Sequence, residues 1–223
     1  MTTPILRQAC PADLEPLIAL QQRSMRHLGA EFYRRDEIEA YLAQCGTMDP
    51  RLIWDGTYYV VEVEGRLAAG AGWTLRRANY QPLLREELPT IPGQVGTVRS
   101  VFVDAGFTRQ GLARLLMAQV ELAMYLAGVE TAEAMGTLPG MPLSRRLGYG
   151  EMSRHILQFE GGIGFAVRRL VKPLSWNSAE AVRSEVIAQP VAYTPAPQAW
   201  CGGSPPIHHA VPEGRGRTTA EAP

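Results

Sequence analysis

The chain of 223 residues has no apolar run near the ~20 residues that a membrane-spanning helix needs, so no membrane partner is expected. It also lacks net charge, because 22 basic residues balance 22 acidic ones. Proteins that bind nucleic acid through bulk charge are usually more basic, so no nucleic-acid partner is expected either. The basic residues are almost all arginine, and we interpret the single lysine, Lys172, as coding bias without functional weight.

Cysteine is scarce in this sequence. Cys10, Cys45 and Cys201 are an odd number, lie far apart and have no metal-ligand spacing, which argues against a disulfide framework or a metal site. The first eight residues lack the basic segment and apolar core of a secretory signal. We therefore expect reduced thiols in a cytoplasmic protein.

Sustained periodicity is missing from residues 175–223, which hold seven of the 17 prolines and end in Pro-, Gly-, Thr- and Ala-rich sequence. Such a segment buries too little apolar surface to offset its ordering entropy. The composition predicts one domain over residues 1–174 and a largely disordered tail, with one short helix allowed over Ser178–Ala188. Three aromatic residues of the tail are interpreted as isolated side chains rather than docked ones: Trp176, Tyr193 and Trp200.

Residues 1–174 mix strand and helix patterns, which predicts an α/β domain of the α+β kind. The expected strands are Pro4–Ala9, Thr57–Glu64, Leu67–Leu75, Thr97–Asp104, Val129–Thr137, Glu151–Phe159 and Ile163–Lys172, the last two forming a hairpin. The expected helices are Asp13–Leu28, Asp36–Gln44 and Leu112–Ala127, followed by a loop–helix–loop over Leu138–Tyr149.

Three local features add to this outline. Asp13 is expected to cap the first helix. The run Ala69–Gly72 makes one strand unusually small, which indicates that another group packs close to it. The polar, proline-containing connection Arg76–Gly96 has the length at which loops in compact domains are often functional.

A tight turn joins the strand that ends at Asp104 to the strong helix that follows. A helix N-terminus leaves backbone N–H groups unpaired and carries partial positive charge, so it favours anions. Gly111 and Ala113 let a phosphate approach the backbone, and Arg109 and Arg114 bracket the turn. The pattern predicts a phosphate site here; the alternative is that Gly111 only eases helix–sheet packing. The sequence contains neither a P-loop motif nor a dinucleotide-binding fingerprint.

The run Thr108-Arg109-Gln110-Gly111-Leu112-Ala113 resembles the acyl-CoA signature of the GNAT superfamily of N-acyltransferases, Gln/Arg-x-x-Gly-x-Gly/Ala, with Thr in the first position. The order of elements from Ile5 to Leu174 is similar too, and Gly148-Tyr149 resembles the Gly-Phe/Tyr pair that follows the family's last helix. The resemblance implies a mostly antiparallel central sheet that is splayed at the signature strand, flanked by helices and closed by a C-terminal hairpin.

The same resemblance implies a site for acetyl-CoA as co-substrate. Backbone groups of the signature strand would hold the pantetheine arm by hydrogen bonds, and N–H groups near the end of this strand would polarise the thioester carbonyl. The residues concerned are Val101, Phe102 and Val103. The turn would cradle the pyrophosphate: Thr108, Arg109, Gln110, Gly111, Leu112, Ala113 and Arg114. The acceptor, a small-molecule amine, would lie across the sheet, near the first helices and Arg76–Gly96.

One departure from the family pattern concerns the proton donor. The last helix of the family usually begins with Phe-Tyr, and that Tyr protonates the leaving thiolate, whereas this chain has Leu143-Ser144. A serine hydroxyl is a much weaker acid than a phenol, so Ser144 is expected to donate a hydrogen bond or position a water. Tyr149 is assigned to packing.

A general base is assigned to Glu133, with a solvated or paired surface carboxylate as the alternative. Asp104, Glu62 and Glu64 are weaker candidates of the same kind. The four histidines have no visible partner and are treated as bystanders: His27, His155, His208 and His209.

The leading hypothesis is an N-acetyltransferase in which the amine attacks acetyl-CoA directly, without a metal, in a monomer or homodimer. A second hypothesis is an acyl-CoA-binding sensor without turnover, which the missing Phe-Tyr pair favours. A third is an unrelated α/β module that binds another phosphate ligand.

Overall fold

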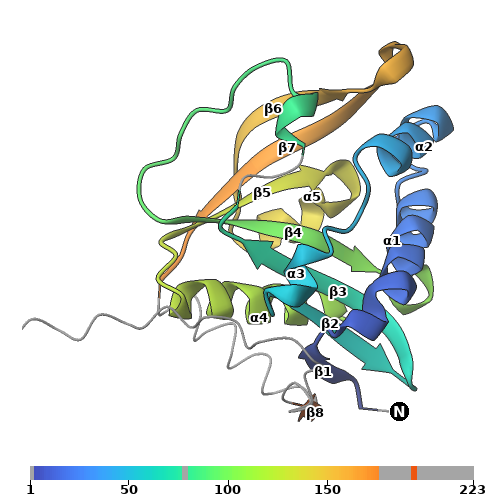
Figure 1. Ribbon diagram of the computed structural model, residues 1–223, viewed down its shortest axis with the longest axis vertical. Helices are drawn as coiled ribbons and strands as arrows, with labels where there is room; N and C mark the ends of the chain where they lie inside the picture. The colour runs from blue at the N-terminus through green and yellow to red at the C-terminus, as the bar shows by residue number, and fades with distance from the viewer. Residues whose placement is uncertain (1–2, 77–79, 176–191, 195–223) are drawn as a thin grey trace, which may run out of the picture.

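The computed structural model describes residues 3–76, 80–175 and 192–194. Within these ranges eight strands form one sheet in the order β6-β7-β5-β4-β3-β2-β1-β8 (Figure 1). Neighbours are antiparallel except for β4–β5 and β1–β8. The strands are β1 (Ile5–Gln8), β2 (Tyr58–Val63), β3 (Arg66–Thr74), β4 (Val95–Val103), β5 (Thr131–Thr137), β6 (Gly150–Gln158), β7 (Gly164–Pro173) and β8 (Ala192–Thr194).

Helices cover both faces of this sheet. They are α1 (Leu14–Leu28), α2 (Arg35–Gln44), α3 (Arg51–Trp54), α4 (Leu112–Leu126) and α5 (Met141–Arg146), with 3-10 turns at Pro11–Asp13, Gln81–Leu83, Ala105–Phe107, Leu138–Gly140 and Glu160–Gly162. Alternation along β2 separates the two cores, as expected for a strand. Tyr58 and Val60 pack with α1 and α3, whereas Tyr59 and Val61 pack against α4.

The sheet opens between its two central strands. β4 and β5 run parallel and pair only over Val95–Val98 and Thr131–Ala134. Beyond this point β4 stays with β3, and β5 continues along β7 as far as Thr137. The expected mixed, mostly antiparallel sheet that is splayed at the signature strand is therefore confirmed, together with its closing hairpin β6–β7.

The small residues of β3 make room for one aromatic ring. A methyl group added at Gly70 would lie 2.7 Å from the Tyr58 hydroxyl oxygen, and one added at Gly72 would lie 2.5 Å from the ring. The expected close packing on this strand is confirmed, and the group that packs there is Tyr58, which is fully buried.

The expected role of Asp13 is wrong. Asp13 already has helical backbone angles and gives α1 no side-chain cap. Its carboxylate instead accepts hydrogen bonds from the Cys10 N–H at 2.8 Å and from both terminal nitrogens of Arg7 at 2.7 and 2.9 Å. These contacts hold the pKa of Asp13 below its usual value although burial alone would raise it.

Two elements are additional to the expected outline. The four-residue helix α3 follows Pro50, and β8 pairs in parallel with β1 at the edge of the sheet. β8 lies inside the segment predicted to be a disordered tail, so Ala192–Thr194 return to the domain. The short helix expected over Ser178–Ala188, and Trp176 and Trp200, lie outside the described residues.

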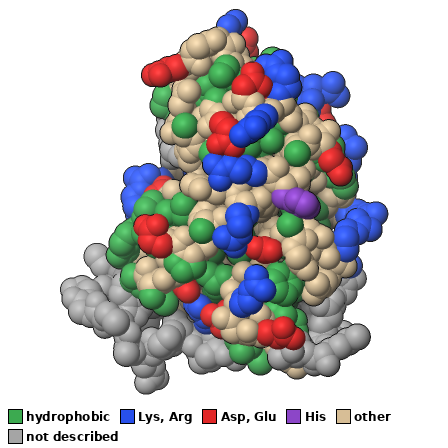
Figure 2. Space-filling model, turned by 90° about the vertical axis from the view of Figure 1, so that its right-hand side faces the viewer, with side chains coloured by type: hydrophobic (Ala, Val, Ile, Leu, Met, Phe, Trp, Pro, Cys, Tyr) green, Lys and Arg blue, Asp and Glu red, His purple; other side chains and the backbone are tan. Residues whose placement is uncertain are grey.

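The face formed by α1 and α2 carries mixed charge. Figure 2 shows Lys and Arg side chains interspersed with Asp and Glu over this face, without a continuous patch of either sign. Exposed ion pairs such as Arg26–Glu39, at 2.8 Å, account for part of this pattern. Within the described ranges, no helix combines the length and apolar character required to span a bilayer.

Candidate functional site

A β-bulge in β4 marks the point where the sheet opens. Arg99 pairs with Gly72 and Phe102 with Gly70, so Ser100 and Val101 share one position of β3. Ser100 has a left-handed backbone with φ of 51°. Because β5 has already separated from β4 here, the bulge has no strand partner on that side.

Side chains from three segments stabilise the bulge. The Tyr58 hydroxyl donates to the Ser100 carbonyl oxygen at 2.7 Å and accepts from the Gln21 amide at 2.9 Å. The Ser100 hydroxyl donates to the carbonyl oxygen of Thr47 at 2.5 Å. Left-handed backbone is costly for a residue with a side chain, so these bonds hold a conformation that β4 would not adopt alone.

A cleft of about 250 Å³ occupies the opening between β4 and β5. One wall is β4 from Val98 to Val103, and the opposite wall is β5 together with α5. Ala113 and Met117 of α4 line it on one face of the sheet, whereas its other end reaches α1 and the Tyr41 ring of α2. Its lining is mainly apolar, so the cleft is suited to a slender chain that needs backbone hydrogen bonds.

The bend after β4 leads from this cleft to the start of α4. Asp104 accepts the Gly106 N–H at 3.0 Å, which begins the turn. Arg109 and Gly111 then adopt left-handed backbones with φ of 63° and 81°, and Gly111 is the N-cap of α4 without a capping side chain. Residues 109–111 are exposed and no side chain caps α4, so this end of the helix is suited to an anion.

The side chains around the bend take different positions. Leu112 is buried in the core, so only its backbone can contribute to an anion site, and Ala113 lines the cleft. Arg109 and Arg114 are exposed at the bend and on the first turn of α4. Asp104, a weaker base candidate of the sequence, is paired with Arg23 at 3.1 Å. Burial raises the pKa of this carboxyl, but the Gly106 N–H and Arg23 outweigh it and hold the value below normal.

Ser144, which by sequence matches the family's donor position, lines the cleft. The hydroxyl donates to the Gly140 carbonyl oxygen at 3.1 Å, one turn earlier along α5. Tyr149 also lines the cleft but belongs to the buried core. Burial and the nearby charge of Glu121 raise the pKa of its phenol well above normal, which makes it a poor acid.

Glu133 lies outside the cleft, on the face of β5 that α4 does not cover. Its Oε1 accepts the Arg169 Nε–H at 2.6 Å, and both residues line a second cavity of about 260 Å³. This cavity lies beneath the connection that follows β3 and is walled also by Thr97 of β4 and by Tyr80. The sequence alone had no signal for Arg169, which is 3% exposed.

A third cavity, of about 60 Å³, lies between the other two. It shares Tyr41, Val98, Ser100 and Met135 with the cleft and shares Tyr80 with the second cavity. The Arg99 guanidinium stacks on the Tyr80 ring, with 5.6 Å from its central carbon to the ring centre.

Other titratable side chains lie apart from these cavities or cannot assemble a metal centre. His155 contacts the Ser153 hydroxyl at 2.6 Å on β6, away from the cleft. Glu62, another weaker base candidate, is paired with Arg7 at 2.5 Å, and Glu64 sits at the β2–β3 turn. Among the described side chains, no three His, Cys, Asp or Glu residues cluster as metal ligands would.

Comparison with known protein families assigns residues 18–149 to the acetyltransferase (GNAT) family. The matched region begins within α1, contains the bulged strand, the bend, α4 and α5, and ends at Tyr149. No curated protein matches the sequence.

Solved structures with the same fold are numerous. A GCN5-related N-acetyltransferase from Rhodopseudomonas palustris superposes with a TM-score of 0.59 at 17% identity, covering 78% of this chain and 98% of that one. The PaiA N-acetyltransferase of Thermoplasma acidophilum, solved with coenzyme A, gives 0.53 at 12% identity, with coverages of 77% and 99%. At these identities the likeness establishes the fold alone.

Proposed function

Because the chain belongs to the acetyltransferase (GNAT) family, we propose that it transfers an acetyl group from acetyl-CoA to a small-molecule amine. The observation that carries this proposal is the continuity of three features. A bulged strand has unpaired backbone, an apolar cleft opens beside it, and an exposed bend presents free amide protons at the end of the cleft. Together they match a ligand with a thin polyamide arm and a diphosphate.

The strand side of the site fits the pantetheine arm. Val101, Phe102 and Val103 line the cleft, and the separation of β5 leaves space for a pseudo-strand that pairs with β4. The bulge turns the backbone at Ser100 and Val101 away from the regular ladder with β3. Backbone N–H groups at this point would polarise the thioester carbonyl, which is the largest electrostatic contribution available here.

The bend fits the pyrophosphate. Its amides and the positive end of the α4 dipole favour an anion, and the coenzyme A bound to the Thermoplasma relative supports the same ligand class for this chain. The proposed contacts are the backbone of residues 108–113 and the side chains of Arg109 and Arg114.

The chemistry we propose is direct attack. The amine nitrogen forms a bond to the thioester carbonyl carbon, the carbon–sulfur bond breaks, and the sulfur leaves with a proton. Ser144 would donate a hydrogen bond to that sulfur, and Glu133, which lines the second cavity and not the cleft, would accept the amine proton through a chain of waters. Holding the two reactants in attack geometry supplies much of the rate, about 7–11 kcal/mol in favourable cases.

A binding module without turnover is the second candidate. The observation that favours it is at Ser144, whose hydroxyl already donates to Gly140 and is a weak acid. No described residue on α5 offers a phenol in its place.

Two measurements test these proposals on the whole chain. Titration calorimetry with acetyl-CoA tests binding, and thiol release across a panel of amines tests turnover. Binding with turnover supports the transferase, binding without turnover supports the sensor, and no binding contradicts both. Glu133→Gln tests the base: a lower kcat with unchanged acetyl-CoA binding supports the assignment, and an unchanged kcat contradicts it.

A further inference from the structure

The acceptor side of the sheet contains a row of cavities whose length the proposed reaction does not explain, although it uses Glu133 in the second cavity. The cleft is followed by the small third cavity and then by the second cavity. Alternate residues of two strands connect them. On β4, Thr97 lines the second cavity and Arg99 the third, and on β5 the corresponding residues are Glu133 and Met135.

Arg169 lies at the far end of this row with incomplete hydrogen bonding. It pairs in register with Met135, its Nε donates to Glu133, and it lines the second cavity. Its Nη1 is buried, and no described residue accepts a hydrogen bond from it. A buried guanidinium N–H without an acceptor is costly, so a ligand that brings an oxygen to this wall would gain that interaction.

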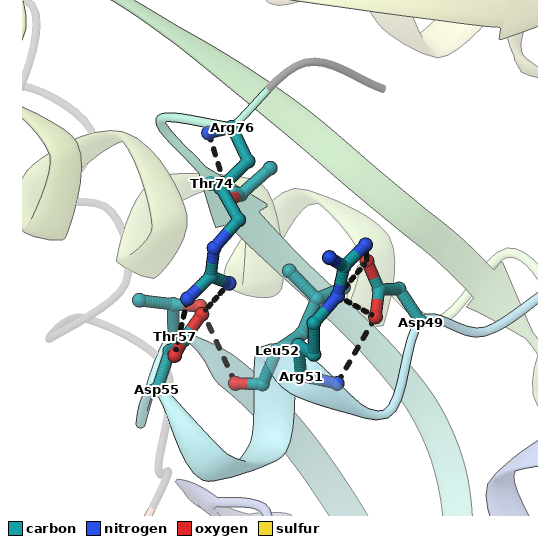
Figure 3. Close-up of polar contacts among 7 residues, drawn as sticks. All are labelled: Asp49, Arg51, Leu52, Asp55, Thr57, Thr74 and Arg76. Carbon is teal, nitrogen blue, oxygen red and sulfur yellow. Dashed lines mark hydrogen bonds and ion pairs between the residues drawn. The ribbon is translucent and has the colours of Figure 1, made fainter. Parts of the chain in front are cut away.

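The charges around the second cavity determine which kind of ligand oxygen can bind to Arg169. Two basic residues, Arg76 and Arg169, and two acidic ones, Glu87 and Glu133, line it. Arg169 is paired with Glu133, and Figure 3 shows the Arg76 guanidinium directed at the Asp55 carboxylate, which it contacts with both terminal nitrogens. Because both cations are already paired, a carboxylate would add an unpaired charge, and an ammonium has no lone pair to accept the Arg169 N–H; an uncharged carbonyl supplies the acceptor without the charge.

The strand geometry sets the length of the ligand. Thr97 in the second cavity and Ser100 at the cleft are three residues apart on β4, which corresponds to about 10 Å. We infer that the acceptor is an elongated primary amine with an uncharged amide carbonyl about 10 Å from the reacting nitrogen, bound by Arg169. This inference rests on the proposed acetyl transfer and names the class of its acceptor.

The test compares four acceptors of one chain length by thiol release: 8-aminooctanamide, 8-aminooctanoate, 1,8-diaminooctane and octylamine. The carboxamide is expected to exceed octylamine about tenfold in kcat/KM, because hydrogen bonds to charged groups are stronger than neutral ones. Equal values, or a faster carboxylate or diamine, overturn the inference while leaving acetyl transfer intact. Glycylglycylglycinamide, run beside 8-aminooctanamide, shows whether a peptide or a small amide supplies the carbonyl, and either supports the inference.

A second measurement uses no turnover. Octanamide, which has the carbonyl but no amine, is titrated into the whole chain. Binding supports the inference even where no amine is acetylated, and absence of binding together with equal rates contradicts it. A failure of acetyl-CoA to bind would instead count against the proposed function.

Arg169→Lys connects the effect to this side chain. Lysine keeps a cation for Glu133 but lacks the planar fork of donors, so the ratio of carboxamide to octylamine rates is expected to fall to about one. Arg154→Lys, on the exposed part of β6, is the matched control and should keep the wild-type ratio. An unchanged ratio in a folded Arg169→Lys protein overturns the assignment, and the acceptor series on the wild type remains decisive if that variant does not fold.

Discussion

The two sides of the site are built in different ways. The cofactor side, residues 101–114, is one continuous run: a strand, a bend and the first turn of α4. The acceptor side, formed by the second and third cavities, takes its walls from α2, the loop after it, the connection before β4, and three strands. One side is therefore local in sequence, and the other exists only once the sheet has formed.

This difference has a chemical consequence. The cofactor side offers mainly backbone groups, which every sequence supplies as long as the bend has suitable φ angles. The acceptor side offers side chains such as Arg169, Glu133 and Tyr80. Binding of acetyl-CoA should depend on conformation at the bend, and the choice of acceptor should depend on the identity of a few buried residues.

The largest expected effect is on a buried ion pair that belongs to neither side and connects the strand layer to α4. Lys172 of β7 donates to Glu121 of α4 at 2.6 Å, and both side chains are buried. Lys172→Met leaves the Glu121 carboxylate without its cation and should lower the free energy of unfolding by about 3 kcal/mol, measured in urea.

The double variant Glu121→Leu/Lys172→Met controls for the loss of the pair itself. Replacing both charges by apolar groups removes the buried unpaired carboxylate and should restore most of the stability. A double variant as unstable as Lys172→Met alone would show that packing, and not charge, is what the lysine supplies.

Lys172 also shows what the sequence could not reveal. On sequence alone, this single lysine is given no functional role. Its partner Glu121 is 51 positions away on another element, so the sequence does not indicate the pair. Arg169 and Glu133 are paired across β7 and β5 in the same way, and no pattern along the chain connects them. Pairing of this kind is set by strand register, which one sequence does not specify.

The elements themselves were largely predictable. The strands and the three long helices agree with the expected ranges within about two residues, as is usual for element boundaries. The bend at Gly111 could be predicted from the sequence because a backbone φ of 81° favours glycine and because the helix that follows is strongly apolar. The four-residue helix α3 is too short for a periodic signal, and β8 lies in a segment whose composition favours disorder.

The next largest effect separates conformation from charge on the cofactor side. Gly111→Val forces a β-branched residue into a left-handed backbone and places methyl groups where a phosphate would approach. Acetyl-CoA affinity is expected to fall about 100-fold, which corresponds to roughly 2.7 kcal/mol. Calorimetry on the whole chain measures this change.

Gly128→Val is the matched control for that experiment. Gly128 follows the other end of α4, has φ of 80°, and has no atom within 4 Å of an added methyl group. Its replacement should cause a similar backbone strain but leave acetyl-CoA binding at the wild-type value. Equal losses of affinity in both variants would mean that α4 stability, and not access to the bend, controls binding.

A smaller effect is expected from charge at the bend. Arg109→Glu reverses the side chain closest to the proposed pyrophosphate and should weaken acetyl-CoA binding about tenfold, less at high salt because the residue is exposed. Arg35→Glu, at the exposed start of α2, makes the same change in net charge far from the bend and should leave affinity unchanged. Unaltered binding in Arg109→Glu would contradict the placement of the diphosphate.

The smallest effect is expected at Ser144, which lines the cleft opposite β4. Removing its weak hydrogen bond in Ser144→Ala should lower kcat about threefold, with little change in KM for acetyl-CoA, since a neutral hydrogen bond contributes about 0.5–1.5 kcal/mol. Ser153→Ala, on β6, controls for the loss of a hydroxyl elsewhere. Ser144→Tyr should raise kcat above wild type because a phenol is the stronger acid. A tyrosine variant without any gain, beside an unaffected alanine variant, would remove Ser144 from the reaction and leave the positioning of amine and thioester as the source of the rate.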